Sequence, residues 1–438
     1  MGAAGRDFHD FNTVFRDDEH VRVVGFTHTA AQNIGELDEL PSRRYPPELA
    51  GERYPDGIPI HAEDELEALI EEEAVDTVVF SYSDVSHEHV MHQASRALAA
   101  GADFRIVGPG RMMLSASVPV IAVDAVRTGS GKSQTSRKVA ALVRDRDVDV
   151  VVVREPMPYG DLADQRVQRF ASVAELEAAD LTIEELEEFE GHVERGFTVY
   201  AGVDYAAVLD AATEEADLIV WDGGNNELPF FVPDLHLVLA DPHRPGDEVT
   251  YHPGETNLRL ADYVIINKEN TADGEDVETV VENVRATNPD ATIVHADSVV
   301  SADGDAIAGK RVVVVEDGPT LTHGGAPFGA GMIAAREHDA GEIVDPTPYT
   351  VGSLEGIFEE YDHLDHVIPA MGYDANQIED LEATIRAAEP EAVVSGTPHD
   401  LERLIDVEAP IVRVTYELEE RTVTLDSILD RHADELGL

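Results

Sequence analysis

Short runs of apolar, mostly β-branched residues alternate along the chain with longer segments in which apolar positions recur at helical spacing among acidic ones. The apolar runs are followed by turns that contain Gly or Pro, which is typical of strands. Predicted strands cover 21–25, 77–82, 104–107, 118–123, 148–153, 218–221, 235–239, 263–266, 312–315, 392–394 and 411–414. Predicted helices cover 63–73, 86–100, 133–144, 182–190, 205–215, 277–287, 378–388 and 425–435. Near-continuous apolar strands that alternate with helices indicate α/β units on parallel sheets covered on both faces.

Turn-rich segments divide the chain into three predicted parts. The first part, 1–115, ends in VGPGRMML, and the second, 116–308, starts with a buried strand and a glycine-containing loop. The third part, 309–438, follows SADGDAIAGK, although its first strand could also extend the sheet of the second part. The chain starts with MGAAGRDFHDF, a glycine turn before a helix that normally follows a strand. The first strand is therefore either absent or encoded upstream of Met1, and we expect the second.

The composition is strongly acidic. The chain has 438 residues, with 89 acidic and 31 basic ones, a net charge of −58 and no cysteine. The acids are spread along the chain, which predicts a solvated acidic surface of the kind found in halophilic proteins, where molar salt screens self-repulsion. There is no basic stripe to bind nucleic acid, no apolar run that could cross a membrane and no signal-peptide pattern. We therefore expect a cytoplasmic protein, and the missing cysteines exclude disulfides and thiolate catalysis.

The segment DAVRTGSGKSQTS, 124–136, has the pattern of a phosphate-binding loop between a predicted strand and a predicted helix. Gly131, Lys132 and Ser133 match the end of GxxxxGK[ST], whereas Val126 stands where the first glycine belongs. In such loops main-chain N–H groups and the helix start bind phosphate, the lysine reaches the outer phosphates and the hydroxyl binds Mg²⁺. An ordinary strand-to-helix turn is the alternative. Because the chain has so few lysines, we interpret the segment as a working loop with a modified entrance.

Two further segments carry polar residues that an NTPase needs beside this loop. In ADLIVWDGGNN, Asp222 ends a predicted strand and is expected to hold Mg²⁺, unless it only caps a turn. In YVIINKENTA, Asn267 and Lys268 resemble the start of the NKxD element by which GTPases read guanine. The Asp position is Asn270, which leaves the choice between ATP and GTP open.

The third part has a second glycine-rich loop, VEDGPTLTHGGAPFGAGM. We expect it to bind a second anion with His323 at its entrance; glycines that serve only tight packing are the alternative. Cationic side chains that follow other strand ends are expected to bind the same substrate. The expected substrate residues are Gly324, Gly325, Arg154, His243 and Arg244.

Several long motifs resemble the cyclic 2,3-diphosphoglycerate synthetase family, whose members are also labelled predicted GTPases. They include VRTGSGKSQTSR, MPYGDLADQRVQRF, WDGGNNELPFFVPDLH, ADPHRPG, YHPGETNLR, VEDGPTLTHGG and PAMGY. The resemblance spans nearly the whole chain and implies a Rossmann-like amino-terminal domain, a P-loop NTPase domain and a carboxy-terminal α/β domain.

The resemblance also implies a ligase that uses ATP and Mg²⁺ to close an intramolecular phosphoanhydride in 2,3-bisphosphoglycerate. The implied catalytic residues are Lys132, Asp222 and His323. The implied nucleotide and Mg²⁺ residues are Gly129, Ser130, Gly131, Lys132, Ser133, Asn267, Lys268 and Asp222. A P-loop GTPase acting as a regulatory switch or metallochaperone-like protein is the alternative, as is a nucleotide-binding protein without turnover. A homodimer is left open.

Overall fold

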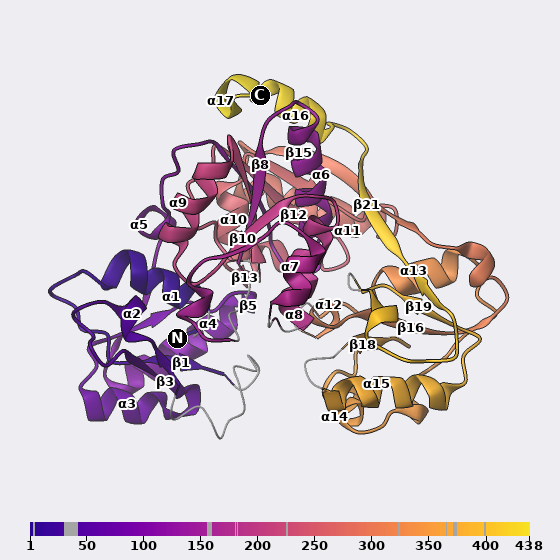
Figure 1. Ribbon diagram of the computed structural model, residues 1–438, viewed down its shortest axis with the longest axis horizontal. Coiled ribbons are helices and arrows are strands. Elements are labelled where there is room, and N and C mark those ends of the chain that lie inside the picture. The colour runs from indigo at the N-terminus through magenta and orange to yellow at the C-terminus, as the bar shows by residue number, and fades with distance from the viewer. Residues whose placement is uncertain are drawn as a thin grey trace.

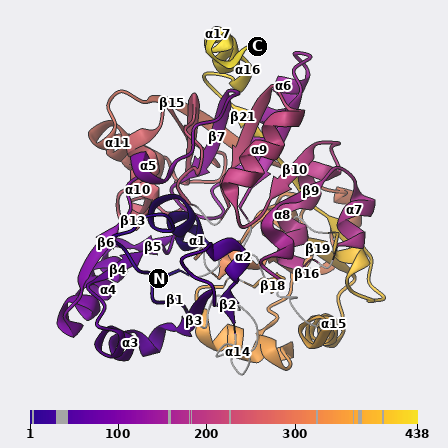
Figure 2. The ribbon, with the colours of Figure 1, turned by 60° about the vertical axis from the view of Figure 1, so that its left-hand side comes forward.

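The computed structural model has three parts arranged around one large sheet (Figure 1). It describes residues 1–2, 5–29, 43–155, 160–179, 181, 183–224, 227–322, 325–364, 366–370, 375–397 and 400–438. Figures 1 and 2 both show the amino-terminal and carboxy-terminal parts at the same end of the central sheet, with α16 and α17 at the opposite end. No helix in the described part of the chain is long and apolar enough to span a membrane.

The central sheet has nine strands in the order β21-β15-β14-β12-β7-β11-β8-β10-β9, parallel except for the outer strands β21 and β9. Its strands are β7 (Val120–Ala125), β8 (Val150–Arg154), β9 (Gln168–Phe170), β10 (Thr198–Ala201), β11 (Leu218–Asp222), β12 (Leu235–Ala240), β14 (Tyr263–Ile266), β15 (Thr292–Ser301) and β21 (Thr415–Glu420). Its helices are α6 (Lys132–Arg144), α7 (Val173–Ala178), α8 (Ile183–Val193), α9 (Tyr205–Glu215), α10 (Gly254–Leu260) and α11 (Gly274–Thr287). Strands β7, β11 and β12 are buried at every position, as their unbroken apolar sequences predict.

The amino-terminal part contains two small sheets. Strands β1 (Phe26–His28), β3 (Ile58–Ala62) and β2 (Arg44–Tyr45) form one, and β4 (Thr77–Phe80) and β6 (Asp103–Ile106) form the other. Its helices are α1 (Arg6–Asp10), α2 (Pro47–Ala50), α3 (Leu66–Glu73), α4 (His87–Ala100) and α5 (Pro109–Met112), and β5 (Val85–Ser86) pairs with β13 (Tyr251–His252).

The predicted strand at 21–25 is wrong, because only the residues that follow it pair with β3. Next to β4, the Met1 amine donates to the Val79 carbonyl, and the Ser81 N–H donates to the Met1 carbonyl.

The carboxy-terminal part has its own parallel sheet, formed by β16 (Arg311–Asp317), β17 (Glu342–Ile343), β18 (Ile368–Ala370), β19 (Ala392–Ser395) and β20 (Ile411–Arg413). Its helices are α12 (Gly318–Leu321), α13 (Ala330–Glu337), α14 (Ser353–Glu360) and α15 (Ala375–Ala388). The chain then returns to the central sheet through β21, α16 (Leu425–Arg431) and α17 (Ala433–Leu436).

The predicted third part, 309–438, is wrong at its end, because the last segment of the chain returns to the central sheet. Leu418, Leu425, Ile428 and Leu429 are buried in the apolar core of the central sheet. The end of the chain therefore belongs to the central domain, because its apolar side chains are buried against the central sheet.

Candidate active site

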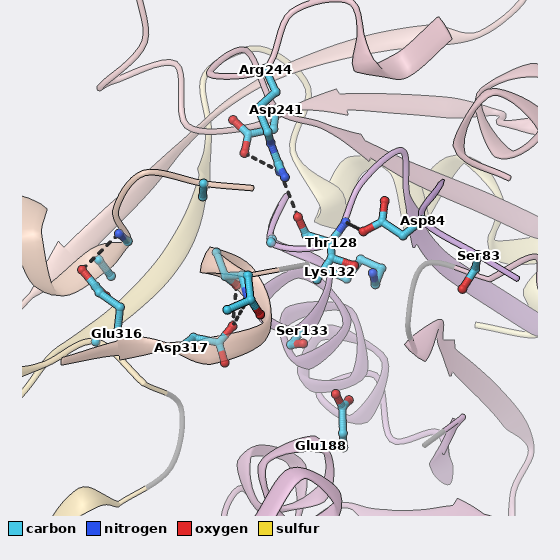
Figure 3. Close-up of a pocket in the computed structure, with 18 of the residues that line it drawn as sticks. Ser83, Asp84, Thr128, Lys132, Ser133, Glu188, Asp241, Arg244, Glu316 and Asp317 are labelled. Carbon is cyan, nitrogen blue, oxygen red and sulfur yellow. Dashed lines mark hydrogen bonds and ion pairs between the residues drawn. The ribbon is translucent and has the colours of Figure 1, made fainter. Parts of the chain in front are cut away.

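A cavity of about 740 Å³ lies where the three parts of the chain meet. It opens beside the phosphate-binding loop, at the carboxyl ends of the central parallel strands, where ligands bind in sheets of this kind. Figure 3 shows residues of all three parts around it, among them Asp84, Lys132, Ser133 and Glu316. The chemistry of the protein is therefore expected in this cavity.

The loop after β7 has the backbone that phosphate binding requires. Gly129 and Gly131 have φ angles of 79° and 112°, and a Cβ at either position would contact side chains at less than normal distance. Val126, at the position of the usual first glycine, is buried. Helix α10 approaches it closely at Gly254, where a Cβ would collide with the Val126 carbonyl. The modified entrance thus leaves the second half of the loop unchanged.

Lys132 starts α6 and points into the same space. Its side chain is buried, and it donates no hydrogen bond to any of the described residues. Burial and the Arg154 guanidinium lower the pKa of Lys132, whereas Asp84, Asp222 and Asp124 favour its charged form. An ammonium group that is buried without an acceptor is well suited to bind a phosphate.

Asp222 ends β11 next to the loop strand, as predicted. Its Oδ2 accepts from His192 Nε2 at 2.8 Å and forms an ion pair with Arg154 Nη1 at 2.5 Å. Although burial opposes its charge, these two groups hold the pKa of Asp222 well below its usual range. Its Oδ1 is buried and has no hydrogen-bond partner among the described residues. A carboxylate with one unused oxygen, on the strand next to the loop strand, fits a role in holding Mg²⁺.

The two glycines after Asp222 allow close contacts within the protein. A Cβ at Gly223 would collide with the Asp124 carboxylate, and one at Gly224 would collide with the Glu155 carbonyl. These glycines are needed for contacts within the protein.

Arg154 and His192 connect Asp222 to helix α8. Arg154 also forms an ion pair with Glu188, and both side chains line the cavity. Arg154 was predicted as a substrate residue, but its guanidinium is engaged by two carboxylates. Helix α8 was predicted from its periodicity, yet Glu188 and His192 were missed because nothing in the local pattern distinguishes them from the many surface acids and histidines of the chain.

Asp241, at the end of β12, organises the other side of the loop. It accepts from Lys268 Nζ at 2.7 Å and from Arg244 Nη2 at 3.0 Å, and these cations hold its pKa well below the usual range despite burial. Arg244 also donates to the Thr128 carbonyl at 2.9 Å. His243 lies nearby and contacts the Thr271 hydroxyl at 2.9 Å. Arg244 therefore contacts the nucleotide loop, and the His243 ring also packs edge-on against Phe328 of the second glycine-rich loop, with ring centroids 6.3 Å apart.

The NKEN segment contacts the same loop. Asn267 donates to the Ser130 carbonyl at 2.9 Å. The Asn270 amide donates to the Ser298 carbonyl at 3.0 Å and accepts from the Ser298 N–H at 3.2 Å. Both hydrogen-bonding groups of the Asn270 side chain are thus bonded to strand β15, and neither is available to bind a nucleotide base.

Asp84 reaches the loop from the amino-terminal part. Its carboxylate accepts from the Thr128 N–H at 3.1 Å (Figure 3). It also accepts from Arg127 Nε at 2.6 Å. No sequence signal identified Asp84, because it lies 44 residues before its partner. The amino-terminal part is therefore attached directly to the nucleotide loop.

The second glycine-rich loop holds a carboxylate of its own chain. Glu316, near the end of β16, accepts from the N–H groups of Gly329, Gly331 and Met332 at 3.0, 3.1 and 2.8 Å (Figure 3). Burial raises the pKa of Glu316 to about 7. The predicted anion site is corrected at these amides, because Glu316 already takes the place of an external anion. Gly325 is exposed with a φ of 66°, and His323 and Gly324 lie outside the described residues.

Two buried glutamates form the cavity wall between the amino-terminal part and the central sheet. This acidic wall consists of Glu155, which follows β8, and Glu227. The Glu227 main chain is fixed by Gly224 and Asn257, at 3.0 Å each. Buried Arg6 of α1 lies 3.6 Å from Glu227. No local sequence pattern identifies this wall, since its members come from separate segments.

The chain is 56% identical over 421 residues to a protein of Thermococcus kodakarensis named arginine synthetase ArcE, covering 96% of this chain and 93% of that protein. Among solved structures, LpxK from Aquifex aeolicus in complex with ATP matches 84% of this chain and 99% of its own, with 11% identity and a TM-score of 0.40. The hydrogenase maturation factor HypB from Archaeoglobus fulgidus matches 48% of this chain and 89% of its own, with 18% identity and a TM-score of 0.27. No protein-family model matches the chain.

Proposed function

The chain belongs to the family of the arginine synthetase ArcE, and from this premise we propose that it is an ATP- and Mg²⁺-dependent ligase that forms arginine. The observation that carries the proposal is a cavity with a phosphate loop on one wall and buried carboxylates on another. Such a cavity suits a reaction that joins phosphoryl chemistry to a nitrogen-rich, cationic product.

The nucleotide side of the reaction is assigned to the loop after β7. Main-chain N–H groups around Gly129 and Gly131 and the Lys132 ammonium would bind the phosphates of ATP. Ser133 and Asp222 would hold Mg²⁺, which neutralises phosphate charge during transfer. Arg154 and His192 orient Asp222, and Arg244 and Asn267 fix the loop from outside.

The chemistry of arginine narrows the other substrates. A guanidine differs from a urea by one nitrogen in place of the carbonyl oxygen, so ATP can drive the exchange by carrying that oxygen away as phosphate. The reactants are then the ureido analogue of arginine (citrulline), ammonium and ATP, and the products are arginine, ADP and phosphate. The protein has to position the ureido oxygen near the outer phosphate of ATP and keep water out.

The test is a product assay in molar NaCl with Mg²⁺ and either ATP or GTP. We expect arginine, detected by chromatography, only when citrulline, ammonium and ATP are all present, with one ADP formed per arginine. Nucleotide hydrolysis at a rate independent of citrulline and ammonium would overturn the proposal.

A second candidate is the closure of 2,3-bisphosphoglycerate implied by the sequence motifs. The observation in its favour is the set of cations near the loop, namely Lys132, Arg154 and Arg244. The engagement of Arg154 and Arg244 by carboxylates, and of the second glycine-rich loop by Glu316, weighs against a doubly phosphorylated substrate. Adding 2,3-bisphosphoglycerate to the same assay, with phosphorus NMR as the readout, separates the two candidates. A GTPase switch would instead turn over GTP without either substrate.

A further inference from the structure

The acidic wall ends in buried oxygen atoms that accept no hydrogen bond from the described residues, and one of them, Glu227 Oε2, forms an ion pair with Arg6 Nη1 at 3.6 Å. Glu155 and Glu227 are 3% and 4% exposed, and both line the cavity. One carboxylate oxygen of each, Oε2, is buried without a hydrogen-bond partner among the described residues. Buried carboxylate oxygens are normally paired, because leaving them unpaired costs free energy. Two such atoms at one cavity wall indicate a ligand that donates hydrogen bonds.

Buried acidic groups outnumber the cations around the acidic wall, which also favours a cationic ligand. Asp7 and Asp10 of α1 are buried behind it, which brings the number of buried carboxyl groups to four. Arg6 is the cation that lies among them, at 3.7 Å from Asp10 and 3.6 Å from Glu227, and the Met1 amine lies near Asp7. Arg154 lines the cavity too, but it is paired with Asp222 and Glu188. The wall therefore has room for a further positive charge.

The pKa values of the two glutamates are consistent with this excess of negative charge. Burial and the neighbouring Glu227 raise the pKa of Glu155 well above its usual range. Burial raises the pKa of Glu227 to about 7, although Arg6 and the Ser83 hydroxyl oppose the shift. A bound cation would lower both pKa values again, because it favours the ionised carboxylates.

We infer that the acidic wall is the subsite for the nitrogen donor, where Glu155 and Glu227 bind ammonium and, after reaction, the guanidinium group of the product. This inference rests on the proposed function and assigns residues to its second substrate. The two groups share one chemistry, a planar or tetrahedral nitrogen cation with several N–H donors, which paired carboxylates bind well.

The subsite also accounts for how ammonium becomes a nucleophile. One carboxylate of the wall takes a proton from ammonium and leaves ammonia with a free electron pair. That pair forms the new C–N bond at the ureido carbon, whose oxygen already carries the phosphoryl group from ATP, and the C–O bond breaks. The departing phosphate takes the surplus proton of the new amino group, and the wall releases its proton to solvent.

The experiment compares Glu155→Gln and Glu227→Gln with the unaltered protein. Both changes keep the side-chain shape and remove the charge. We expect the KM for ammonium to rise by about 10- to 100-fold, the effect of one charged hydrogen bond, while the KM for ATP stays the same. Glu360→Gln is the matched control, since Glu360 lines the same cavity from the carboxy-terminal part but is exposed. Assays are run in NaCl, because K⁺ resembles ammonium in size, and circular dichroism verifies the fold of each variant.

The outcomes separate the inference from the proposed function. If the unaltered protein makes arginine and both wall variants keep its KM for ammonium, the inference is overturned and the function stands. If the unaltered protein makes no arginine, the proposed function fails, and arginine binding measured by calorimetry decides the inference. Weaker binding in the two wall variants, with binding kept in Glu360→Gln, supports the subsite; equal binding in all four proteins overturns it.

Discussion

Lys132 is the side chain on which nucleotide chemistry depends most directly. It is buried at the start of α6 and has no acceptor among the described residues, so its charge is available to a phosphate. We expect Lys132→Ala to lower kcat by about 100- to 1000-fold, as removal of one preorganised donor does elsewhere. Lys310→Ala, which removes a lysine outside the cavity, serves as the control and should retain full activity. Turnover by Lys132→Ala equal to that of the control would contradict this assignment.

Asn270 gives a second prediction at the residue scale. Because its amide is bonded to both main-chain groups of Ser298, an aspartate there would lose one hydrogen bond and place its charge against a carbonyl. We expect Asn270→Asp to lower the free energy of unfolding by about 1–3 kcal/mol and to leave the ratio of kcat/KM for ATP and GTP unchanged.

Asn288→Asp is a matched control for this change. Asn288 donates to the carbonyls of Leu258 and Ala261, both at 2.9 Å, and lies away from the cavity. It should destabilise the protein to a similar extent. A gain of GTP preference in Asn270→Asp alone would show that position 270 reads the base.

At the scale of elements, strand β16 and helix α13 are joined by one carboxylate. Glu316 accepts three N–H groups at the start of α13, including Gly331, where a Cβ would contact β16 and Gly396 at 3.0–3.2 Å. We expect Glu316→Ala to lower the unfolding temperature, because three N–H groups, two of them buried, lose their acceptor. Added formate, a free carboxylate of the same chemistry, should restore part of the loss. Glu342→Ala, at an exposed ion pair with Arg311, is the control and should show no formate effect.

The same carboxylate makes stability depend on pH. The pKa of Glu316 is about 7 in the folded protein, against the ordinary value of 4.5 that applies to the unfolded chain. Between these two pH values the folded state therefore binds more protons than the unfolded state. Stability contributed by this group is therefore present below about pH 4.5 and is lost as the pH rises to about 7. We expect the free energy of unfolding of the unaltered protein to fall more steeply between about pH 5 and 7 than that of Glu316→Ala, measured by denaturation at constant salt. Parallel curves would contradict the raised pKa.

At the scale of the whole molecule, charge repulsion opposes folding. With 89 acidic residues against 31 basic ones, screening has to act over the entire surface. The Debye length falls from about 10 Å at 0.1 M salt to about 3 Å at 1 M. We expect the unfolding temperature to rise steeply with KCl concentration. A non-ionic osmolyte at equal osmolality is the control, and an equal rise with that osmolyte would show that screening is not the cause.

The connection between the three parts also belongs to this scale. Asp84 bonds the phosphate loop from the amino-terminal part, and Arg403 of the carboxy-terminal part donates to Glu190 of α8 at 3.3 Å. The central domain is thereby tied to both neighbours, and the cavity between them is held in shape by polar contacts.

Local patterns were sufficient to predict most strands, the phosphate loop and the position of Asp222. Strand and helix periodicity depends on neighbouring residues, and a phosphate loop is built from consecutive main-chain groups. Both can therefore be predicted from the sequence. Val126 at the start of the loop was predicted to be compatible with phosphate binding. In the fold, Gly254 leaves the space in which the Val126 carbonyl lies.

The pairing of charges was decided by tertiary structure alone. In a chain with so many acids, composition does not distinguish Glu155, Glu188 or Glu227 from surface residues, because a carboxylate becomes functional only through burial and partners contributed by distant segments. Likewise Glu316 reaches amides 13 to 16 residues away and thereby fills a loop that resembled an anion site. Local spacing specifies where a backbone can bind phosphate, whereas the surrounding fold determines which charges remain available to a ligand.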